Sequence, residues 1–188
     1  MTIPTRIRAA APRLQEERGV ALAVAIFAIV IIGMLVAGVF YASYLEQRTG
    51  APALTRLLVV GMGRLGGGEQ GYGSDADVVF VHDPVEGADE GEAQTQALDV
   101  VKELIRLLGL RGPDPNLDVD ASLRPEGKSG PLVRSLESFR QYYDRWSLVW
   151  EAQALLRATP VAGDPELAQR YLALVAPIRW PQGGLDEG

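Results

Sequence analysis

The longest apolar block of the chain runs from Val20 to Ala42 and contains no charged residue. In a helix, its 23 residues would rise about 34 Å, which is more than a hydrocarbon core of roughly 30 Å. The block is also too long for the core of a cleavable signal peptide. The pattern predicts a transmembrane helix, and the alternative is a buried helix of a water-soluble domain.

Two shorter apolar runs, Leu57–Val60 at the end of the segment Leu54–Val60, and Val78–Val81, flank a glycine-rich segment. Short apolar runs that are rich in β-branched residues and bounded by glycine are typical of buried strands. The pattern therefore predicts a strand, a glycine-rich crossing and a second strand. Further along the chain, Asn116–Asp120 alternates polar and apolar residues and predicts another short strand.

Two segments have the spacing of helices with one apolar face. In Thr95–Leu108 the apolar residues recur every three or four positions, and Gly109 is well placed to end the helix. A second helix is predicted to begin near Leu136, with Ser135 as its N-terminal cap. Its large side chains continue at helical spacing, and we interpret this stripe as core: Phe139, Tyr142, Tyr143, Trp146, Val149, Trp150 and Gln153.

Composition narrows the possible chemistry. The 188 residues suffice for a domain with a hydrophobic core, and the net charge of −6 argues against non-specific nucleic-acid binding, which needs a basic surface. The absence of cysteine excludes disulfides and thiolate metal sites. The single histidine, His82, excludes a multi-histidine zinc site, and we interpret it as a polar residue at a strand end. Carboxylates remain as the candidate metal ligands.

Charge also divides the chain into two unlike parts. Residues 1–50 contain five arginines and three acidic residues, whereas residues 51–188 contain thirteen basic and twenty-one acidic residues. The change coincides with a Thr49-Gly-Ala-Pro52 break. We therefore expect an N-terminal basic segment with its apolar helix over 1–50, and a separate domain over 51–188.

The glycine-rich crossing ends in two acidic residues beside the start of the second strand. Asp75 and Asp77 are two positions apart, so on a strand their side chains share a face and can bind the same divalent cations. Just before them, Gly73 offers an unobstructed backbone N–H and Ser74 a hydroxyl, both suited to phosphate. An acidic surface turn is the alternative interpretation.

These residues form the Gly-Ser…Asp-x-Asp signature of the nucleotidyltransferase superfamily. The longer string from Gly61 to Asp77 closely resembles glutamine synthetase adenylyltransferase, with Gln70 in place of that family's usual leucine. The string Trp150-Glu-Ala-Gln-Ala-Leu-Leu-Arg157 also matches the family, in the form found in its C-terminal, adenylyl-attaching domain. The resemblance covers residues 54–185.

The resemblance implies an α/β nucleotidyltransferase fold, in which helices pack on a mixed sheet. The family string Val119-Asp120-Ala-Ser-Leu-Arg-Pro125 selects Asp120 as the third metal ligand, with Asp118 as the second choice. Two Mg²⁺ ions would bridge the three aspartates and ATP. Arg64 and Arg124 could bind the triphosphate; alternatively, Arg64 is a surface residue and Arg124 pairs with Glu126.

The reaction that the resemblance implies is transfer of AMP from ATP to a tyrosine hydroxyl of glutamine synthetase, in the cytoplasm. Because the family's domain continues in further helices, we expect a domain truncated at its C-terminus and a poor catalyst. The segment Glu126–Gly130 contains Gly-Lys-Ser but lacks the Walker spacing, so we reject a phosphate-loop interpretation of it.

The N-terminal part resembles a different family. Residues 16–48, with Glu17-Arg-Gly-Val-Ala-Leu22 before the apolar run, are similar to PilX-type minor pilins, which would be cut after Gly19. The arginines before the apolar run predict a membrane anchor with a cytoplasmic N-terminus and an exported remainder. Two alternatives to a simple adenylyltransferase follow: a membrane-anchored type IV pilus assembly component, or a chimeric fragment with no activity.

Overall fold

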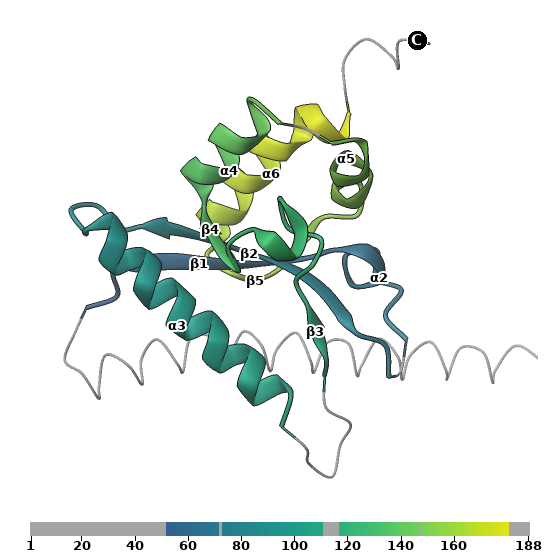
Figure 1. The fold of residues 1–188 in the computed structure, drawn as a ribbon, viewed down its shortest axis with the longest axis horizontal. Helices are drawn as coiled ribbons and strands as arrows, with labels where there is room; N and C mark the ends of the chain where they lie inside the picture. Colours follow the sequence, from purple (N-terminus) through teal and green to yellow (C-terminus); the bar gives the residue numbers. More distant parts are fainter. Residues whose placement is uncertain (1–51, 72, 111–116, 147, 181–188) are drawn as a thin grey trace, which may run out of the picture.

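A mixed sheet of five strands organises the part of the chain that can be described. The strand order is β3-β2-β1-β5, and β4 pairs with β2 as well (Figure 1). The structure is a computed structural model, and it describes residues 52–71, 73–110, 117–146 and 148–180. The mixed sheet and the helices packed on it confirm the predicted mixed α/β architecture.

The centre of the sheet is an antiparallel pair on either side of the glycine-rich crossing. β1 (Thr55–Gly61) and β2 (Ala76–Pro84) pair along almost their whole length. β5 (Thr159–Gly163) pairs with the other edge of β1, also antiparallel. The two strands predicted around the glycines are therefore confirmed, whereas β5 was not predicted.

Two short strands follow one another along the remaining edge of β2. β3 (Val119–Asp120) runs parallel to β2 opposite its first two residues, and β4 (Val133–Ser135) runs parallel to it further along. Residues 121–132 leave the sheet between these two strands, and we refer to them as the 121–132 loop. Because β3 and β4 both pair with β2, each end of this loop is fixed to the same strand.

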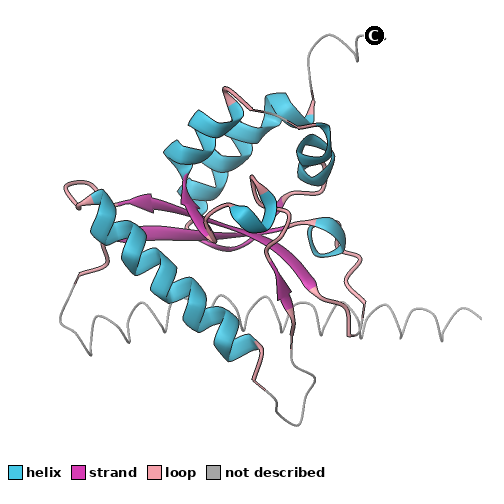
Figure 2. Cartoon of the chain, viewed as in Figure 1, coloured by secondary structure: helices cyan, strands magenta, loops and turns pink. Residues whose placement is uncertain are grey.

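Helices cover both faces of the sheet (Figure 2). The short α2 and the long α3 contribute to one buried cluster, and the three later helices contribute to the other. Figure 1 shows α3 on one side of the strands and α4, α5 and α6 on the opposite side. The bounds are α2 Gly63–Gly66, α3 Glu90–Leu108, α4 Leu136–Tyr143, α5 Val149–Leu155 and α6 Pro165–Arg179.

The pleat of β2 explains why the molecule has two cores. Successive side chains of a strand point to opposite faces. Val79 therefore joins the cluster that contains Phe139 of α4, while its neighbour Val78 joins the cluster that contains Val101 of α3. An uninterrupted apolar run is what a strand buried on both faces requires, and Val78–Val81 is such a run.

Side-chain caps set where the helices begin. The Asp89 carboxylate accepts a hydrogen bond from the Glu92 N–H (2.9 Å), so α3 starts at Glu90, a few residues before the predicted Thr95. The predicted end at Gly109 is confirmed. The Ser135 hydroxyl accepts from the Ser138 N–H (3.2 Å), which confirms the predicted cap of α4.

The interpretation of the aromatic stripe as core is wrong for its second half. Phe139 is buried, but Trp146 is 65% exposed and Val149 is 77% exposed. The prediction assumed one continuous helix, whereas α4 ends at Tyr143 and α5 begins at Val149. The helical phase does not carry across that interval, so Val149 and Trp150 do not continue the buried face of α4, and the buried residues of α5 are Glu151 and Leu155.

Among the residues that the structure describes, no helix combines the length and the apolarity that crossing a membrane would need. The predicted span Val20–Ala42, the pilin-like segment and the predicted boundary near Gly50 lie outside the described residues. They stay predictions.

Candidate metal centre

Strand pairing brings the three predicted carboxylates together. Asp77 is the second residue of β2 and lies directly opposite Asp120 of β3, while Asp75 comes just before β2. One carboxylate oxygen from each of the three residues lies within 4.8 Å of the other two. The expected convergence is therefore confirmed.

The three acids do not share one electrostatic environment. Burial raises the pKa of Asp77, and the negative charges of Asp75 and Asp120 raise it further, against the opposing charge of Arg64. Asp120 differs because hydrogen bonds from Ser122, first from its side chain and then from its backbone N–H (2.7 Å), lower the pKa of its carboxyl group. The charges of Lys128 and Arg124 act in the same direction.

This arrangement fits a divalent cation. After burial, it is repulsion by Asp75 and Asp120 that raises the pKa of Asp77, and a cation between the carboxylates would relieve this repulsion. Three carboxylates also form the hard oxygen donor set that Mg²⁺ prefers. Asp75 is exposed and the other two are half-buried, so an ion and the phosphates attached to it can reach the cluster from solvent. Asp118, the second choice, is outside the cluster.

The glycine-rich crossing is built closely against Asp77. The Met62 N–H donates to the Asp77 carbonyl (2.8 Å), and a Cβ at Gly63 would lie 2.3 Å from an Asp77 carboxylate oxygen. Gly63 also has a φ of +48°, which glycine adopts far more readily than other residues. A side chain at this position would strain the backbone and would press the Asp77 carboxylate out of its place.

A second short turn contains Gly73 and Ser74, the two residues predicted to bind phosphate. Gly73 has a φ of +74°, and no other atom would obstruct a Cβ there. The Ser74 hydroxyl accepts from the Gly71 N–H (3.1 Å) and donates to the Gly71 carbonyl (2.8 Å). The Gln70 amide donates to the carbonyls of Ser74 and Asp75 (both 3.0 Å), so the residue that departs from the family pattern holds this turn.

The two predicted arginines have different surroundings. Arg64 is exposed on α2, near enough to Asp77 to act on its charge. Arg124 instead donates to the carbonyls of Ala121 (2.6 Å), Lys128 (3.1 Å) and Gly130 (3.0 Å), within the 121–132 loop. The alternative pairing of Arg124 with Glu126 is wrong, because Glu126 pairs with Arg134.

Lys128 is the charged neighbour of the cluster that the sequence interpretation missed. It lies in a 3₁₀ turn, η1 (Gly127–Ser129), and its charge acts on Asp120. The signal was present as Gly-Lys-Ser, which we set aside because the Walker spacing is absent. The loop brings this lysine near the carboxylates without that spacing.

Other polar residues have structural partners. Glu69, at the end of the glycine-rich segment, pairs with Arg157 (2.6 Å) after α5. His82 is buried, as an internal residue of β2, and lies 3.0 Å from the Thr55 hydroxyl and 2.7 Å from the Gln94 amide oxygen. It lies six residues along the strand from the start of β2 and is not part of the carboxylate cluster.

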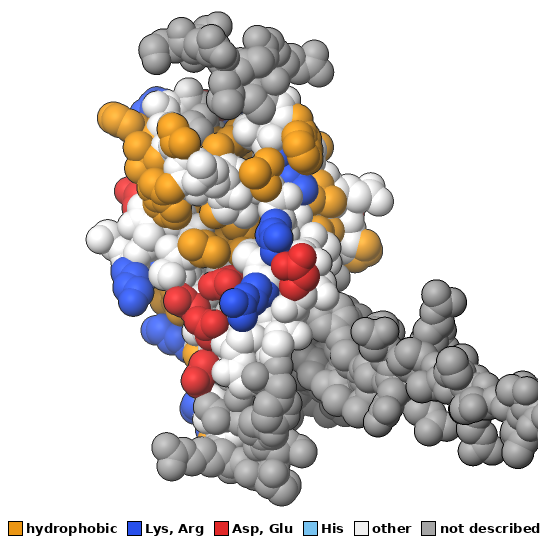
Figure 3. Space-filling view, turned by 90° about the vertical axis from the view of Figure 1, so that its right-hand side faces the viewer, with side chains coloured by type: hydrophobic (Ala, Val, Ile, Leu, Met, Phe, Trp, Pro, Cys, Tyr) orange, Lys and Arg blue, Asp and Glu red, His pale blue; other side chains and the backbone are white. Residues whose placement is uncertain are grey.

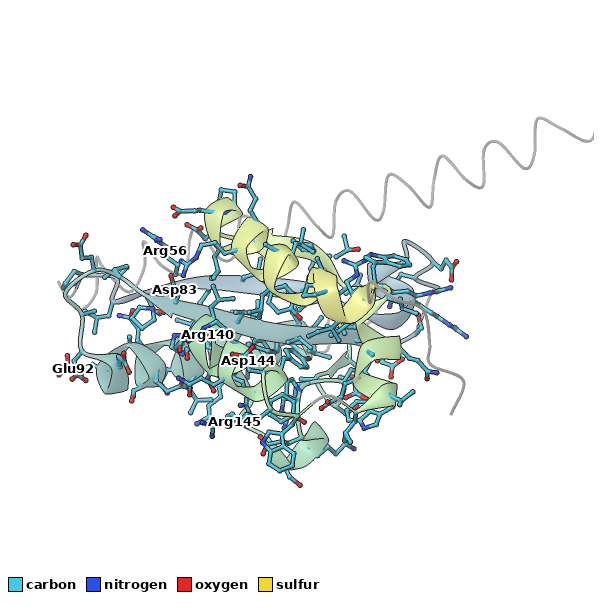
Figure 4. The ribbon with its side chains drawn as sticks, turned by 90° about the horizontal axis from the view of Figure 1, so that it is seen from above. Arg56, Asp83, Glu92, Arg140, Asp144 and Arg145 are labelled. Atoms are coloured by element: carbon cyan, nitrogen blue, oxygen red, sulfur yellow. The ribbon has the colours of Figure 1, made fainter. Side chains whose placement is uncertain are left out.

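At the end of β1 and β2 that is far from the carboxylate cluster, charged side chains form surface ion pairs. Arg56 of β1 lies opposite Asp83 of β2 at that end (Figure 4). Asp83 pairs with Arg170 of α6, and Arg56 is 4.0 Å from Asp164. On the side of α2 and α5, by contrast, Figure 3 shows acidic and basic side chains close together beneath a group of exposed hydrophobic ones.

Comparison with known proteins matches this geometry to a family. The family model described as glutamate-ammonia ligase adenylyltransferase matches residues 13–174. This chain belongs to that family. The match includes the whole carboxylate cluster and the 121–132 loop, and the resemblance to glutamine synthetase adenylyltransferase is confirmed.

Similar proteins from the same family support this assignment. The three described here carry the name bifunctional glutamine synthetase adenylyltransferase/adenylyl-removing enzyme. The protein from Streptomyces avermitilis is 62% identical over 133 residues, which is 71% of this chain and 13% of that protein. The proteins from Streptomyces coelicolor and Mycolicibacterium smegmatis are 56% and 54% identical over 76% and 73% of this chain, and over 14% of each relative. The chain thus spans about one seventh of the relatives' length.

Proposed function

We propose that this chain is a nucleotidyltransferase that moves AMP from ATP to a tyrosine hydroxyl of glutamine synthetase and releases pyrophosphate. The observation that carries the proposal is the cluster of Asp75, Asp77 and Asp120, whose carboxylate oxygens lie within 4.8 Å of one another. The relatives' names supply the acceptor and the adenylyl group. The activity and the acceptor are proposals for this chain.

Asp75, Asp77 and Asp120 would hold two Mg²⁺ ions. The chemistry supplied by the bound ions is neutralisation of charge, which lowers the pKa of an attacking hydroxyl and stabilises the pyrophosphate leaving group. The strand pairing of Asp77 with Asp120 holds their backbones opposite each other, and their carboxylates are close together without any ligand. Preorganisation of this kind is what electrostatic catalysis requires.

The remaining residues would place the nucleotide. The Gly73 N–H and the exposed guanidinium of Arg64 are available to phosphate oxygens at one side of the carboxylates. The Ser74 hydroxyl would have to exchange its bond to the Gly71 carbonyl for one to phosphate. Arg124, with three bonds to backbone carbonyls, would act by holding the 121–132 loop next to Asp120.

The test follows labelled AMP from ATP into glutamine synthetase, using the full chain with and without Mg²⁺. Label should appear on tyrosine only with Mg²⁺, and Asp77→Asn should lower its rate at least about 10²-fold, because the change removes a charge that holds the metal. Binding of ATP to the full chain should depend on Mg²⁺ and should be lost in the same variant. Asp99→Asn is the matched control, because Asp99 is an exposed aspartate on α3.

Two results would refute the proposal. One is binding of ATP that is indifferent to Mg²⁺ and to Asp77→Asn, because the carboxylates would then have no part in it. The other is label transfer that Asp77→Asn and Asp99→Asn leave equally intact.

A further inference from the structure

The 121–132 loop connects two strands that lie on the same edge of β2. β3 pairs with Ala76 and Asp77, and β4 pairs with β2 from Phe80 to His82. The loop therefore begins beside the metal centre, leaves the sheet and returns to the same strand a few residues further along. Its first residue, Ala121, follows Asp120 directly, so the start of the loop is held beside the metal centre.

Arg124 determines how the loop closes. Its guanidinium donates to the carbonyl of Ala121, directly after Asp120, and also to the carbonyl of Lys128. Because one planar group contacts both carbonyls, the backbone of Lys128 returns to the neighbourhood of the metal ligand. A further bond from the same guanidinium to the Gly130 carbonyl fixes the far side of the turn.

The turn itself leaves little freedom. Glu126 and Gly127 both have positive φ, 64° and 58°. A Cβ at Gly130 would lie 2.2 Å from the Pro125 carbonyl, so this part of the loop is closely packed. Arg134 pairs with Glu126 from β4. The position of the Lys128 backbone is therefore determined by contacts that do not involve its own side chain.

The ammonium group of Lys128 is available for a ligand. The side chain is exposed, and it makes no hydrogen bond or ion pair with any residue that the structure describes. The neighbouring arginines differ, since Arg124, Arg134 and Arg157 all bind protein groups. Arg64 resembles Lys128 in having an exposed, unpaired charge within the described residues.

Topology places these two free cations on either side of β2. Arg64 follows β1, which pairs with one edge of β2, and Lys128 lies in the loop after β3, which pairs with the other edge. Metal ions held by the carboxylates would attract a polyphosphate to the position between them. A lysine is a mobile point charge that binds phosphate without a fixed geometry.

We propose that Lys128 binds a phosphate group of the nucleotide from the β3 side of the carboxylate cluster, as the counterpart of Arg64 on the β1 side. The inference rests on the proposed function, since it needs a nucleotide at the metal centre. Lys128 would thus contact the substrate, although its Gly-Lys-Ser segment lacks the Walker spacing.

The experiment measures two affinities of the full chain, one for ATP with Mg²⁺ and one for Mn²⁺ alone. Lys128→Gln should weaken ATP binding about tenfold or more, because a charge-assisted hydrogen bond is lost. Its affinity for Mn²⁺ alone should stay the same or rise, because a positive charge beside Asp120 has been removed. Lys128→Arg should retain most of the ATP affinity. Lys102→Gln, at an exposed site on α3, removes the same charge elsewhere.

Two outcomes overturn the inference while leaving the proposed function intact. In the first, ATP binds Lys128→Gln as tightly as Lys102→Gln, although Asp77→Asn abolishes binding. In the second, Lys128→Gln weakens ATP and Mn²⁺ binding in equal proportion, which identifies a disturbed metal centre. If the unaltered chain binds no ATP with Mg²⁺, the proposed function and this inference both fail.

Discussion

At Gly63, a single hydrogen atom in place of a side chain makes room for the Asp77 carboxylate. A Cβ there would lie 2.3 Å from Asp77 Oδ2, closer than non-bonded atoms can approach. The residue thus acts on the metal centre without contributing a functional group to it. It shows how a glycine-rich segment can position an acidic side chain as well as make room for a phosphate.

We expect Gly63→Ala to weaken Mn²⁺ binding to the full chain at least about tenfold, because the new methyl group must displace the Asp77 carboxylate. It should also lower the free energy of unfolding by about 1–2 kcal/mol, since φ is positive at this position. Both quantities can be measured by metal titration and urea unfolding.

Gly68→Ala provides the matched control for that change. Gly68 also has a positive φ, +69°, but nothing lies within 4 Å of a Cβ there. It should lose similar stability and keep its affinity for Mn²⁺. Equal loss of Mn²⁺ binding in the two variants would show that backbone strain, and not the contact with Asp77, is responsible.

At the scale of the elements, the segment from α4 to α5 depends on one buried carboxylate. Glu151 is 1% exposed. It accepts hydrogen bonds from the Tyr142 hydroxyl (2.7 Å) and from the Leu148 N–H (3.1 Å) that precedes α5, and its Oε1 lies 3.4 Å from the Glu126 N–H in the 121–132 loop. The same side chain therefore joins α4, the start of α5 and the loop beside the metal centre.

Removing the Glu151 side chain should lower the free energy of unfolding more than removing an exposed side chain of the same helix. Glu151→Ala would leave a hydroxyl and a backbone N–H without a partner, so we expect the free energy of unfolding to fall by about 2–4 kcal/mol. Gln153→Ala, at an exposed position of the same helix, should change it by less than about 0.5 kcal/mol. Urea unfolding of both variants checks this, and similar losses would contradict the assigned role of Glu151.

Some elements of the fold could be predicted from the sequence and others could not. The central hairpin, α3 and the Asp77–Asp120 juxtaposition depend on local runs and on a family string, and all three were predictable. The exposure of Trp146 was not, because it depends on where α4 ends rather than on the spacing of aromatic residues. The position of Lys128 was not predictable either, since it depends on carbonyls contacted by Arg124 across several residues.

At the scale of the whole molecule, we expect one buried group, His82, to make stability sensitive to mild acid. His82 lies in β2 between Thr55 of β1 and Gln94 of α3. Burial lowers the pKa of His82 below its ordinary value of 6.5, although Gln94 and Asp83 act in the opposite direction. Because the Gln94 oxygen only accepts, the neutral ring donates to it from Nε2 and accepts from the Thr55 hydroxyl at Nδ1.

The sign of the pH dependence follows from this neutral ring. Below pH 6.5 the unfolded chain binds a proton at His82 before the folded chain does, so acid favours the unfolded state. The stability contributed by the neutral His82 ring is complete above pH 6.5, and it is lost as the pH falls toward the lower pKa of His82 in the folded state. We expect the free energy of unfolding to decrease between about pH 7.5 and 5.5.

His82→Gln tests the assignment, because it removes the chain's single histidine. The variant should be less stable than the unaltered chain at pH 7.5, and its stability should change less over the same pH range. Urea unfolding at several pH values measures both slopes. Parallel curves for the two proteins would mean that another group causes the acid sensitivity.

The exposure of the tryptophans has a spectroscopic consequence. The chain's three tryptophans, Trp146, Trp150 and Trp180, all lie within the described residues and are all exposed. Indole fluorescence shifts when water around the ring is replaced by less polar surroundings. Unfolding should therefore change the emission of this protein little, whereas any molecule that covers these rings should shift it toward the blue. Tryptophan fluorescence would then report on contacts made by these rings more than on the integrity of the two cores.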